Sequence, residues 1–320
     1  MLDRRSLFGL ALGTALPLRA FAQPGGQPLR IILPLQAGAA VDASARIVTD
    51  SLSKALGRPV VIENLPGAGG ITGTAQIVRA APDGNTIGVI STNHAVNPAL
   101  YPNIPFNSLE DITPITMIGT TPLVLMAHPS LGVKNVAELV AAAKAKPGAI
   151  NYGSSGNGTI LHLAVELLAS KTGIKLQHVP YRGAGQFLQD LVAGQIQLGV
   201  FGENVAASYI KSGALVALGV TTATRTSLSP DVPTIAEQGV PGYEIEGWFA
   251  AIGPKNLPVT EVDRLNAAFH AALADPKTRN ALIAQGNAVT PSTPAQAKKV
   301  IGDSIATYAA LVKQIGLKIE

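Results

Sequence analysis

Cysteine is absent from all 320 residues of the sequence. A chain without cysteine has no disulfide framework, no thiolate nucleophile and no cysteine-ligated metal. Aromatic residues contribute only 4% and charged residues 14%, whereas hydrophobic residues contribute 47%. The apolar content is mostly Ala, Val, Leu and Ile, which suits β-branched strands and Ala/Leu helices. This composition favours α/β packing over an aromatic-rich lectin or nucleic-acid surface.

The sequence also lacks any concentration of charge. Its formal net charge is +4, and the lysines and arginines are scattered without a basic run. A protein that follows a phosphate backbone usually carries such a run or patch. We therefore exclude nucleic acid as a partner.

The first 22 residues have the pattern of an export signal. Arg4 and Arg5 precede the mostly apolar stretch Ser6–Leu18, which is followed by the small-x-small sequence Ala20–Ala22. The apolar stretch is shorter than the roughly 20 residues of a membrane span, so a membrane anchor is disfavoured. We expect residues 1–22 to be cleaved after export by the Sec or Tat route, which places the protein in the periplasm.

Short apolar runs alternate with segments of helical spacing along the rest of the chain. Glycine-rich turns stand where strands give way to helices, as in a doubly wound α/β sheet. The predicted strands are Leu29–Leu35, Pro59–Glu63, Thr86–Ser91, Ile150–Gly153, Leu176–Val179, Leu198–Phe201 and Val216–Thr221. The predicted helices are Val41–Leu56, Ile71–Ala81, Val136–Ala145, Thr159–Thr172, Gln186–Ala193, Ala206–Ser212, Glu261–Ala274, Pro276–Gln285 and Pro294–Ile315. Two similar α/β lobes follow, with the C-terminal helices packed on the first.

None of the glycine-rich turns completes an enzyme motif. Gly67–Thr72 ends in Thr where the dinucleotide fingerprint needs a third Gly, and no acidic residue follows to hold a ribose. Gly153–Gly158 lacks the Lys-Ser/Thr ending of a phosphate-binding loop. Ser155 is not in a nucleophile elbow because Asn157 replaces the second Gly. We assign no catalytic residue.

The histidines do not form a metal site either. Among the five histidines, only His162 has a carboxylate, Glu166, one helical turn away. A metal site needs at least three protein ligands, so this pair is interpreted as a structural hydrogen bond. We assign no metal and no cofactor.

Two of the turns suit an anion. Gln36–Ala40 and Gly153–Thr159 each join a strand to a helix, where the first N–H groups have no internal partner and the helix dipole is positive. The small residues let a ligand approach the backbone. The sequence therefore predicts a carboxylate held between two such turns, one per lobe. Asp42 is interpreted as a helix cap in preference to a ligand contact.

Several motifs in a fixed order resemble the periplasmic substrate-binding components of tripartite tricarboxylate transporters, the Bug-type solute receptors. The resemblance runs from about Leu29 to the C-terminus. It rests on Pro34–Asp42 with Arg46, Glu63–Gly70, Pro82–Gly84, His94–Tyr101, Tyr152–Gly158 with His162, Val179–Gly183, Arg225, Pro230–Thr234, Glu237 and Trp248. It implies an α/β, two-lobed periplasmic-binding-protein fold of the Venus-flytrap type II class. We expect one lobe from residues 23–124 and 246–320, the other from 125–245, and a ligand cleft between them.

The resemblance also implies which residues bind the carboxylate. The segments concerned are the loop after the first strand, the segment after the third strand and the Tyr-Gly-Ser motif. Carried over, these are Leu35, Gln36, Ala37, Gly38, Ala39 and Ala40; Thr92, Asn93 and His94; and Ser154, Ser155, Asn157 and Thr159. Arg182 is included, although a lobe-bracing salt bridge explains it equally well.

Two positions depart from the family pattern. Gly38-Ala39-Ala40 replaces a glycine pair before the Asp, and Gly202-Glu203 stands where the family often has an Asp before Asn204. We include Glu203 among the ligand-binding residues, where it would contact an amine or repel a second carboxylate. The change puts an amino-acid ligand in doubt.

The resemblance implies a monomeric receptor without catalysis that hands a small carboxylate to membrane permease subunits. A ligand with an apolar body between its carboxylates, such as adipate or terephthalate, is favoured over citrate because cations near the two turns are few. Two alternatives stay open. The first is a receptor for a membrane sensor kinase, and the second is a periplasmic serine hydrolase using Ser155 and His162.

Overall fold

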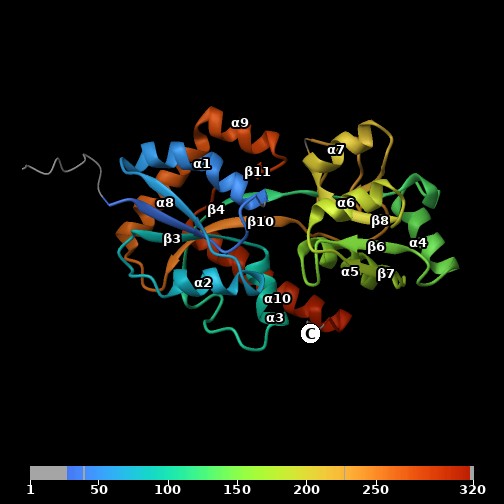
Figure 1. Cartoon of the computed structure of the whole chain (residues 1–320), viewed down its shortest axis with the longest axis horizontal. Coiled ribbons are helices and arrows are strands. Elements are labelled where there is room, and N and C mark those ends of the chain that lie inside the picture. The colour runs from blue at the N-terminus through green and yellow to red at the C-terminus, as the bar shows by residue number, and fades with distance from the viewer. Residues whose placement is uncertain (1–26, 39, 227, 318–320) are drawn as a thin grey trace, which may run out of the picture.

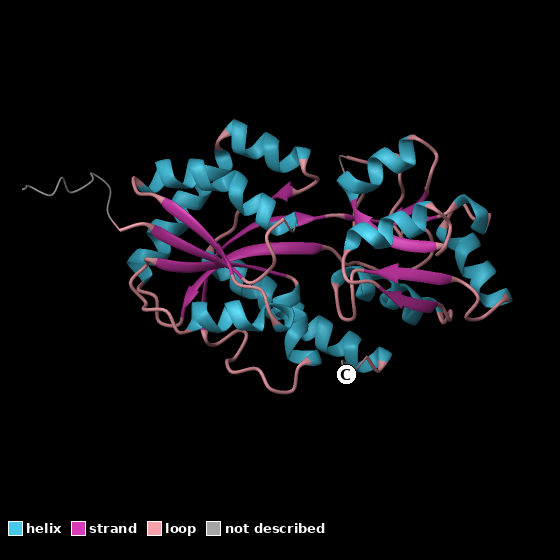
Figure 2. Cartoon of the chain, viewed as in Figure 1, coloured by secondary structure: helices cyan, strands magenta, loops and turns pink. Residues whose placement is uncertain are grey.

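A computed structural model describes residues 27–38, 40–226 and 228–317. The chain forms two lobes, each built around one sheet with helices on both faces (Figures 1 and 2). The predicted export signal and Ala39 lie outside the described residues.

The first lobe contains a six-stranded sheet in the order β11-β4-β10-β3-β1-β2. The parallel strands are β1 (Leu29–Leu33), β2 (Val60–Asn64) and β3 (Thr86–Ser91). The antiparallel pairs involve β10 (Gly247–Pro254), β4 (Ile112–Thr121) and β11 (Ala288–Val289). Short apolar runs form the parallel strands. Strands β1 and β3 are mostly buried, as expected for a sheet covered by helices, whereas β2 forms the edge of the sheet and its Val61 is exposed.

The second lobe contains a five-stranded sheet in the order β7-β6-β8-β5-β9. The parallel strands are β6 (Asn151–Ser154), β7 (Gln177–Pro180) and β8 (Leu198–Gly202), and the antiparallel ones are β5 (Leu123–Ala127) and β9 (Val216–Val220). In both sheets the second parallel strand along the chain is outermost, followed by the first and the third. An antiparallel strand then follows. The two lobes thus share one topology.

Helices cover both faces of each sheet. On the first lobe, α1 (Ala40–Leu56), α8 (Val259–Ala274) and α9 (Pro276–Ala284) lie over one face, and α2 (Ile71–Val78), α3 (Asn93–Leu100) and α10 (Pro294–Ile315) over the other (Figure 1). On the second lobe, α6 (Ala184–Val192) and α7 (Glu203–Lys211) lie opposite α4 (Val136–Ala145) and α5 (Ile160–Thr172). None of the described helices is long and apolar enough to cross a membrane.

The chain crosses between the lobes twice. It leaves the first sheet at the end of β4 and enters the second at the start of β5, with Pro122 between them. It returns after β9 and rejoins the first sheet at Gly247, the start of β10. These crossings lie near the positions expected from the sequence, residues 125 and 245. The exact lobe boundaries stay a prediction.

Most of the predicted elements are present. The strands β4, β5, β10 and β11 are not among the predicted ones, and the ends of the predicted helices differ by up to three residues. Helix α10 has the predicted bounds, because Thr293 forms a capping box with Gln296 and Gly316 ends the helix in a left-handed conformation. Helix α7 begins at Glu203, three residues before the predicted start. Helix α3 was not predicted, because it is short and contains Pro98.

Candidate ligand-binding site

A cavity of about 510 Å³ lies between the lobes, beside the crossing strands. We call it the front cleft. It collects residues from the carboxyl ends of β3, β6 and β8, the edge where open α/β sheets bind ligands. Its walls are Ala40, Val41, Ala43, Ser91, Thr92, Asn93, Thr121, Leu123, Ser155, Thr159, Ile160, Leu161, Ala184, Phe201, Gly202, Asn204, Val205, Gly247, Trp248, Gln285 and Asn287.

No charged side chain lines the front cleft in the described part of the chain. Its polar groups are hydroxyls and amides, contributed by residues such as Thr92, Ser155 and Asn287. Between them stand apolar walls, with Phe201 from the second lobe and Trp248 at the return crossing. The described walls of the cavity therefore offer neutral hydrogen-bonding groups and no side-chain charge.

Several helices begin at the front cleft. The first residues of α1, α3, α5 and α6 line the front cleft, as does Gly202, the N-cap of α7. At α3, α5, α6 and α7 no side chain caps the helix by a hydrogen bond. The first N–H groups of a helix have no partner within it, and the dipole there is positive. Helices from both lobes thus begin at one cavity, an arrangement suited to an anion, although the first N–H of α7, that of Glu203, donates to the carbonyl oxygen of Pro122.

Asp42 holds the loop before α1 in place. This buried carboxylate accepts from the backbone N–H of Gly38 at 2.9 Å, from Asn64 Nδ2 at 2.9 Å and from Arg46 Nε at 3.1 Å. Burial raises the pKa of Asp42, but the hydrogen bonds from Arg46, Gly38 and Asn64 outweigh burial and lower it. Asp42 therefore stays ionised and braces the loop rather than lining the cavity.

A buried polar cluster supports the corresponding loop of the second lobe. His162 accepts from Gly158 N at 3.1 Å through Nδ1, and its ring stacks on His178 with centroids 3.9 Å apart. His178 Nε2 hydrogen-bonds to Ser154 Oγ at 2.7 Å. Burial lowers the pKa of His162 to about 3, with His178 adding to the shift, and lowers that of His178 to about 4. Both rings are therefore neutral at pH 7.

Five of the residues predicted from the sequence line the front cleft, namely Ala40, Thr92, Asn93, Ser155 and Thr159. Others lie near it without lining it. Leu35 and His94 line a small cavity beside Asn93, where His94 Nε2 lies 2.6 Å from the carbonyl oxygen of Ser108. Ser154 is buried beneath its loop, and Gln36, Ala37, Gly38, Asn157 and Arg182 are exposed.

Glu203 lies on another side of the structure. It is the first residue of α7, is only 1% exposed, and lines a second cavity behind the crossing strands. Its neighbours Gly202 and Asn204 line the front cleft instead. The structure thus leaves the front cleft without a carboxylate at this position.

Sequence reasoning missed the cleft residues that come from distant segments. Gln285 and Asn287 follow α9, and Asn287 Oδ1 accepts from Thr121 Oγ1 at 2.9 Å. No local pattern marks them, because pairing of β11 with β4 brings them to the cleft. Trp248 belonged to the family motif but was not assigned to the site. Its position just after the second crossing, beside the expected cleft, could have marked it as a cleft residue.

The site offers no catalytic or metal-binding arrangement in the described residues. Ser155 has no hydrogen bond to His162, whose Nδ1 is occupied by Gly158 N and whose Nε2 lies 3.9 Å from Glu166. No group of three or more His, Cys, Asp or Glu side chains is positioned to hold a metal ion there.

The sequence matches the family model described as tripartite tricarboxylate transporter family receptor over residues 44–317. The chain belongs to this receptor family. It is 34% identical over 316 residues to protein BugT of Bordetella pertussis, covering 98% of this chain and 97% of that one. Members of the family are substrate-binding receptors rather than enzymes, and the chain is such a periplasmic-type solute receptor.

Solved structures have the same fold. The Rhodopseudomonas palustris protein Rpa4515, determined with adipate, superimposes with a TM-score of 0.81 at 30% identity, covering 91% of this chain and 98% of that one. MatC from the same species, with bound malate, gives a TM-score of 0.77 at 28% identity, with coverages of 89% and 98%. The two-lobed periplasmic-binding-protein fold expected from the sequence is therefore confirmed.

Proposed function

We propose that this receptor captures a small dicarboxylate in the front cleft and delivers it to the permease subunits of a tripartite tricarboxylate transporter. The observation that supports this most is the set of helix N-termini from both lobes facing a cavity without charged side chains. Donors on each lobe suit a ligand with a carboxylate at each end. The solved relatives carry adipate and malate.

The walls favour a ligand with an apolar body between the carboxylates. Phe201, Leu123 and Trp248 offer apolar surface in the same cavity as the helix N-termini. A third carboxylate or a hydroxyl placed against that surface loses hydration without a charged partner. We therefore favour adipate or terephthalate over citrate.

We propose that residues 23–124 with 246–320 and residues 125–245 close on this ligand as two lobes in the periplasm, after removal of residues 1–22. The candidate contact residues are the five predicted ones that line the cleft, together with Gly202, Trp248 and Asn287. Delivery to a sensor kinase is the second candidate. Genes for a large and a small membrane subunit beside this one favour transport.

The test is a thermal-shift screen of the mature protein followed by calorimetry with adipate, terephthalate, citrate and the neutral adipamide. A ligand that binds only the folded state at 100 times its Kd stabilises it by about 2.7 kcal/mol. Fluorescence of Trp248, the only tryptophan, gives an independent readout, since this residue lines the cleft. Binding of citrate alone, or equal binding of adipamide and adipate, contradicts the proposal.

A further inference from the structure

A second cavity of about 400 Å³ lies behind the crossing strands, on the opposite side from the front cleft. We call it the rear cavity. Thr120 and Pro122 line it, whereas the alternate residues Thr121 and Leu123 line the front cleft, because successive side chains of an extended strand point to opposite faces. Its other walls are Glu203, Thr222, Ala223, Thr224, Arg225, Thr226, Leu228, Glu244, Glu246, Arg279, Ile283, Asn287, Ala288 and Val289.

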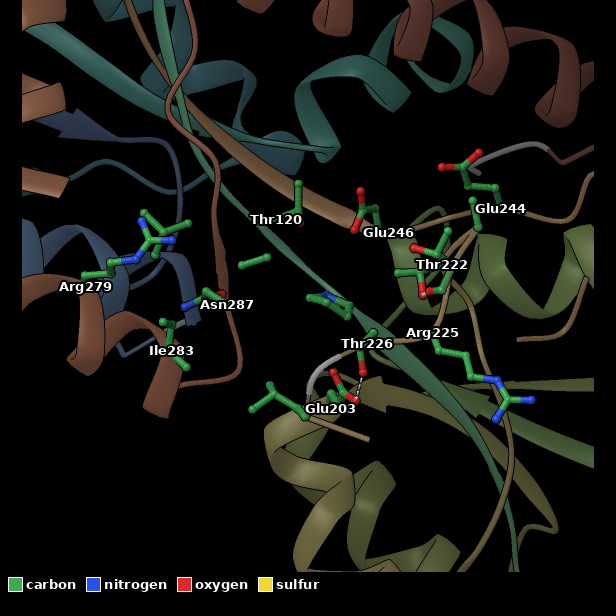
Figure 3. Close-up of a pocket in the computed structure, with 16 residues that line it drawn as sticks. Thr120, Glu203, Thr222, Arg225, Thr226, Glu244, Glu246, Arg279, Ile283 and Asn287 are labelled. Atoms are coloured by element: carbon green, nitrogen blue, oxygen red, sulfur yellow. Dashed lines mark hydrogen bonds between the residues drawn. The ribbon is translucent and has the colours of Figure 1, made fainter. Parts of the chain in front are cut away.

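The carboxylate of Glu203 points into this cavity with an unused acceptor (Figure 3). Oε1 accepts a hydrogen bond from the hydroxyl of Thr226. Oε2 is buried and has no hydrogen-bond partner among the described residues, although Glu203 is only 1% exposed. A buried carboxylate oxygen without a partner costs free energy that a ligand donor recovers.

Two further carboxylates line the same cavity without a positive partner. Neither Glu244 nor Glu246 lies within 4.0 Å of a lysine, arginine or histidine nitrogen in the described part of the chain, and the same holds for Glu203. Burial raises the pKa of Glu246, a hydrogen bond from Thr120 opposes the shift, and the nearby Glu244 adds to it. No cation among the described residues lies close enough to Glu246 to offset this effect of burial.

The two arginines of the rear cavity do not neutralise these groups. Arg225 pairs with Glu237 at 3.0 Å and extends away from Glu203 and Glu246 (Figure 3). Arg279 is exposed on the wall formed by α9, where water solvates its charge. The buried, unsatisfied charge of the cavity is therefore negative.

Apolar surface accompanies this negative charge. Leu228 of the second lobe is 45% exposed and Ile283 of the first is 36% exposed, and both line the rear cavity. A cavity of this volume with apolar walls and a few convergent polar groups has the properties of a small-molecule site. The described residues provide no group of metal-ligating side chains there, which favours an organic ion.

We propose that the rear cavity is a second binding site, for a small organic ammonium ion with an apolar body. The ammonium group donates to Glu203 Oε2 and to Glu246, and the body packs against Leu228 and Ile283. This site lies on the opposite side of the crossing strands from the carboxylate site, and the two cavities share only Asn287 among their described walls.

Benzylamine is a suitable probe, with benzyl alcohol as its neutral match and benzoate as its anionic one. In protein with ¹³C-labelled Leu and Ile methyl groups, benzylamine is expected to shift the Leu228 and Ile283 signals and to leave Leu123 and Ile160 of the front cleft unchanged. Benzyl alcohol and benzoate are expected to leave all four unchanged. Shifts at Leu123 and Ile160 instead, no shift up to millimolar concentrations, or equal shifts with benzyl alcohol overturn the proposal.

Variants then test whether the carboxylates of Glu203 and Glu246 bind the ammonium group. Glu203→Gln and Glu246→Gln each remove one charge-assisted hydrogen bond and are expected to weaken benzylamine binding about tenfold or more. Glu110→Gln removes one exposed charge from the first lobe, away from the cavity, and is expected to change the affinity less than twofold. Each variant is checked for folding by its melting curve. If one of the two glutamate variants does not fold, the other still tests the proposal. Wild-type affinity in both, or an equal loss in Glu110→Gln, overturns the assignment.

Discussion

Gly202 and Glu203 are neighbours in the sequence but line different cavities. Gly202 is the N-cap of α7 and adds no side chain to the front cleft, whereas the side chain of Glu203 lies in the rear cavity. Each orientation follows from the turn by which strand β8 becomes helix α7. The front cleft consequently has helix N-termini in its walls and no carboxylate among its described lining residues.

Gly202→Asp tests this neutral lining. Gly202 has φ −57°, which any residue adopts, and an added Cβ meets only Asn204 Oδ1 at 3.0 Å and Thr121 Cγ2 at 3.6 Å. A carboxylate there repels the ligand across a short distance, so we expect calorimetric affinity for adipate to fall about 100-fold or more. Gly202→Asn, of the same shape, is the control, with a loss below about tenfold. Equal losses would show that bulk, not charge, matters.

At the scale of elements, each cleft loop is held by a buried polar cluster behind it. Asp42 braces the loop before α1, and the stacked rings of His162 and His178 brace the loop before α5. A neutral imidazole suits the second position because Nδ1 of His162 must accept from Gly158. Protonation of that ring removes the acceptor, and protonation of His178 as well places two charged rings face to face.

This cluster predicts a loss of stability in mild acid. The pKa of His162 is about 3 in the folded protein and about 6.5 when unfolded, so the unfolded state takes up the proton first as pH falls. The stability that depends on neutral His162 is fully present above pH 6.5, and about 2 kcal/mol of it is lost at pH 5. His178 has a folded pKa of about 4, so its protonation in the unfolded state lowers the stability of the folded protein over the same pH range.

Urea unfolding at pH 7 and pH 5 measures this effect. His162→Gln keeps an acceptor for Gly158 but does not titrate, so the difference in unfolding free energy between the two pH values shrinks by about 2 kcal/mol. The variant is less stable than wild type at pH 7 because the ring stack is lost. An unchanged difference between the two pH values would exclude His162 as a source of the pH dependence.

At the scale of the whole molecule, the lobes meet at a glycine. Gly286 follows α9 in the first lobe with φ +79°, and a Cβ added there lies 2.7 Å from Cβ and 3.0 Å from N of Asn204 in the second lobe. Asn204 belongs to the first turn of α7 and cannot retreat without moving that helix. The distance between the lobes in this state thus depends on the absence of a side chain at position 286.

Gly286→Ala is expected to hold the lobes apart and weaken binding of the cleft ligand about tenfold. The control is Gly213→Ala, at φ +74° with nothing within 4 Å of the added Cβ. Both substitutions cost about 1–2 kcal/mol for the left-handed backbone, but only Gly286→Ala also separates the lobes. Calorimetry and melting curves of both variants distinguish strain from separation. Equal affinities would contradict a role in closure.

The sequence alone determined the α/β class and most of the strands and helices, and it predicted a strand-to-helix turn in each lobe beside the cleft. These features depend on local periodicity, glycine turns and helix caps, and α10 shows how well such signals mark an element. The sequence also placed Ser155 and Thr159 at the cleft, because a strand end followed by a small-residue turn and a helix is a local pattern.

Only the tertiary structure decided which side of the crossing strands each residue lines. Thr120 lines the rear cavity and Thr121 the front cleft, because successive side chains of a strand point to opposite faces. Gly202 and Glu203 line different cavities because the chain turns from strand to helix between them. Asn287 reaches the cleft through pairing of β11 with β4, more than 160 residues away in sequence. Such placements depend on long-range packing between lobes, for which no short window of sequence carries a signal.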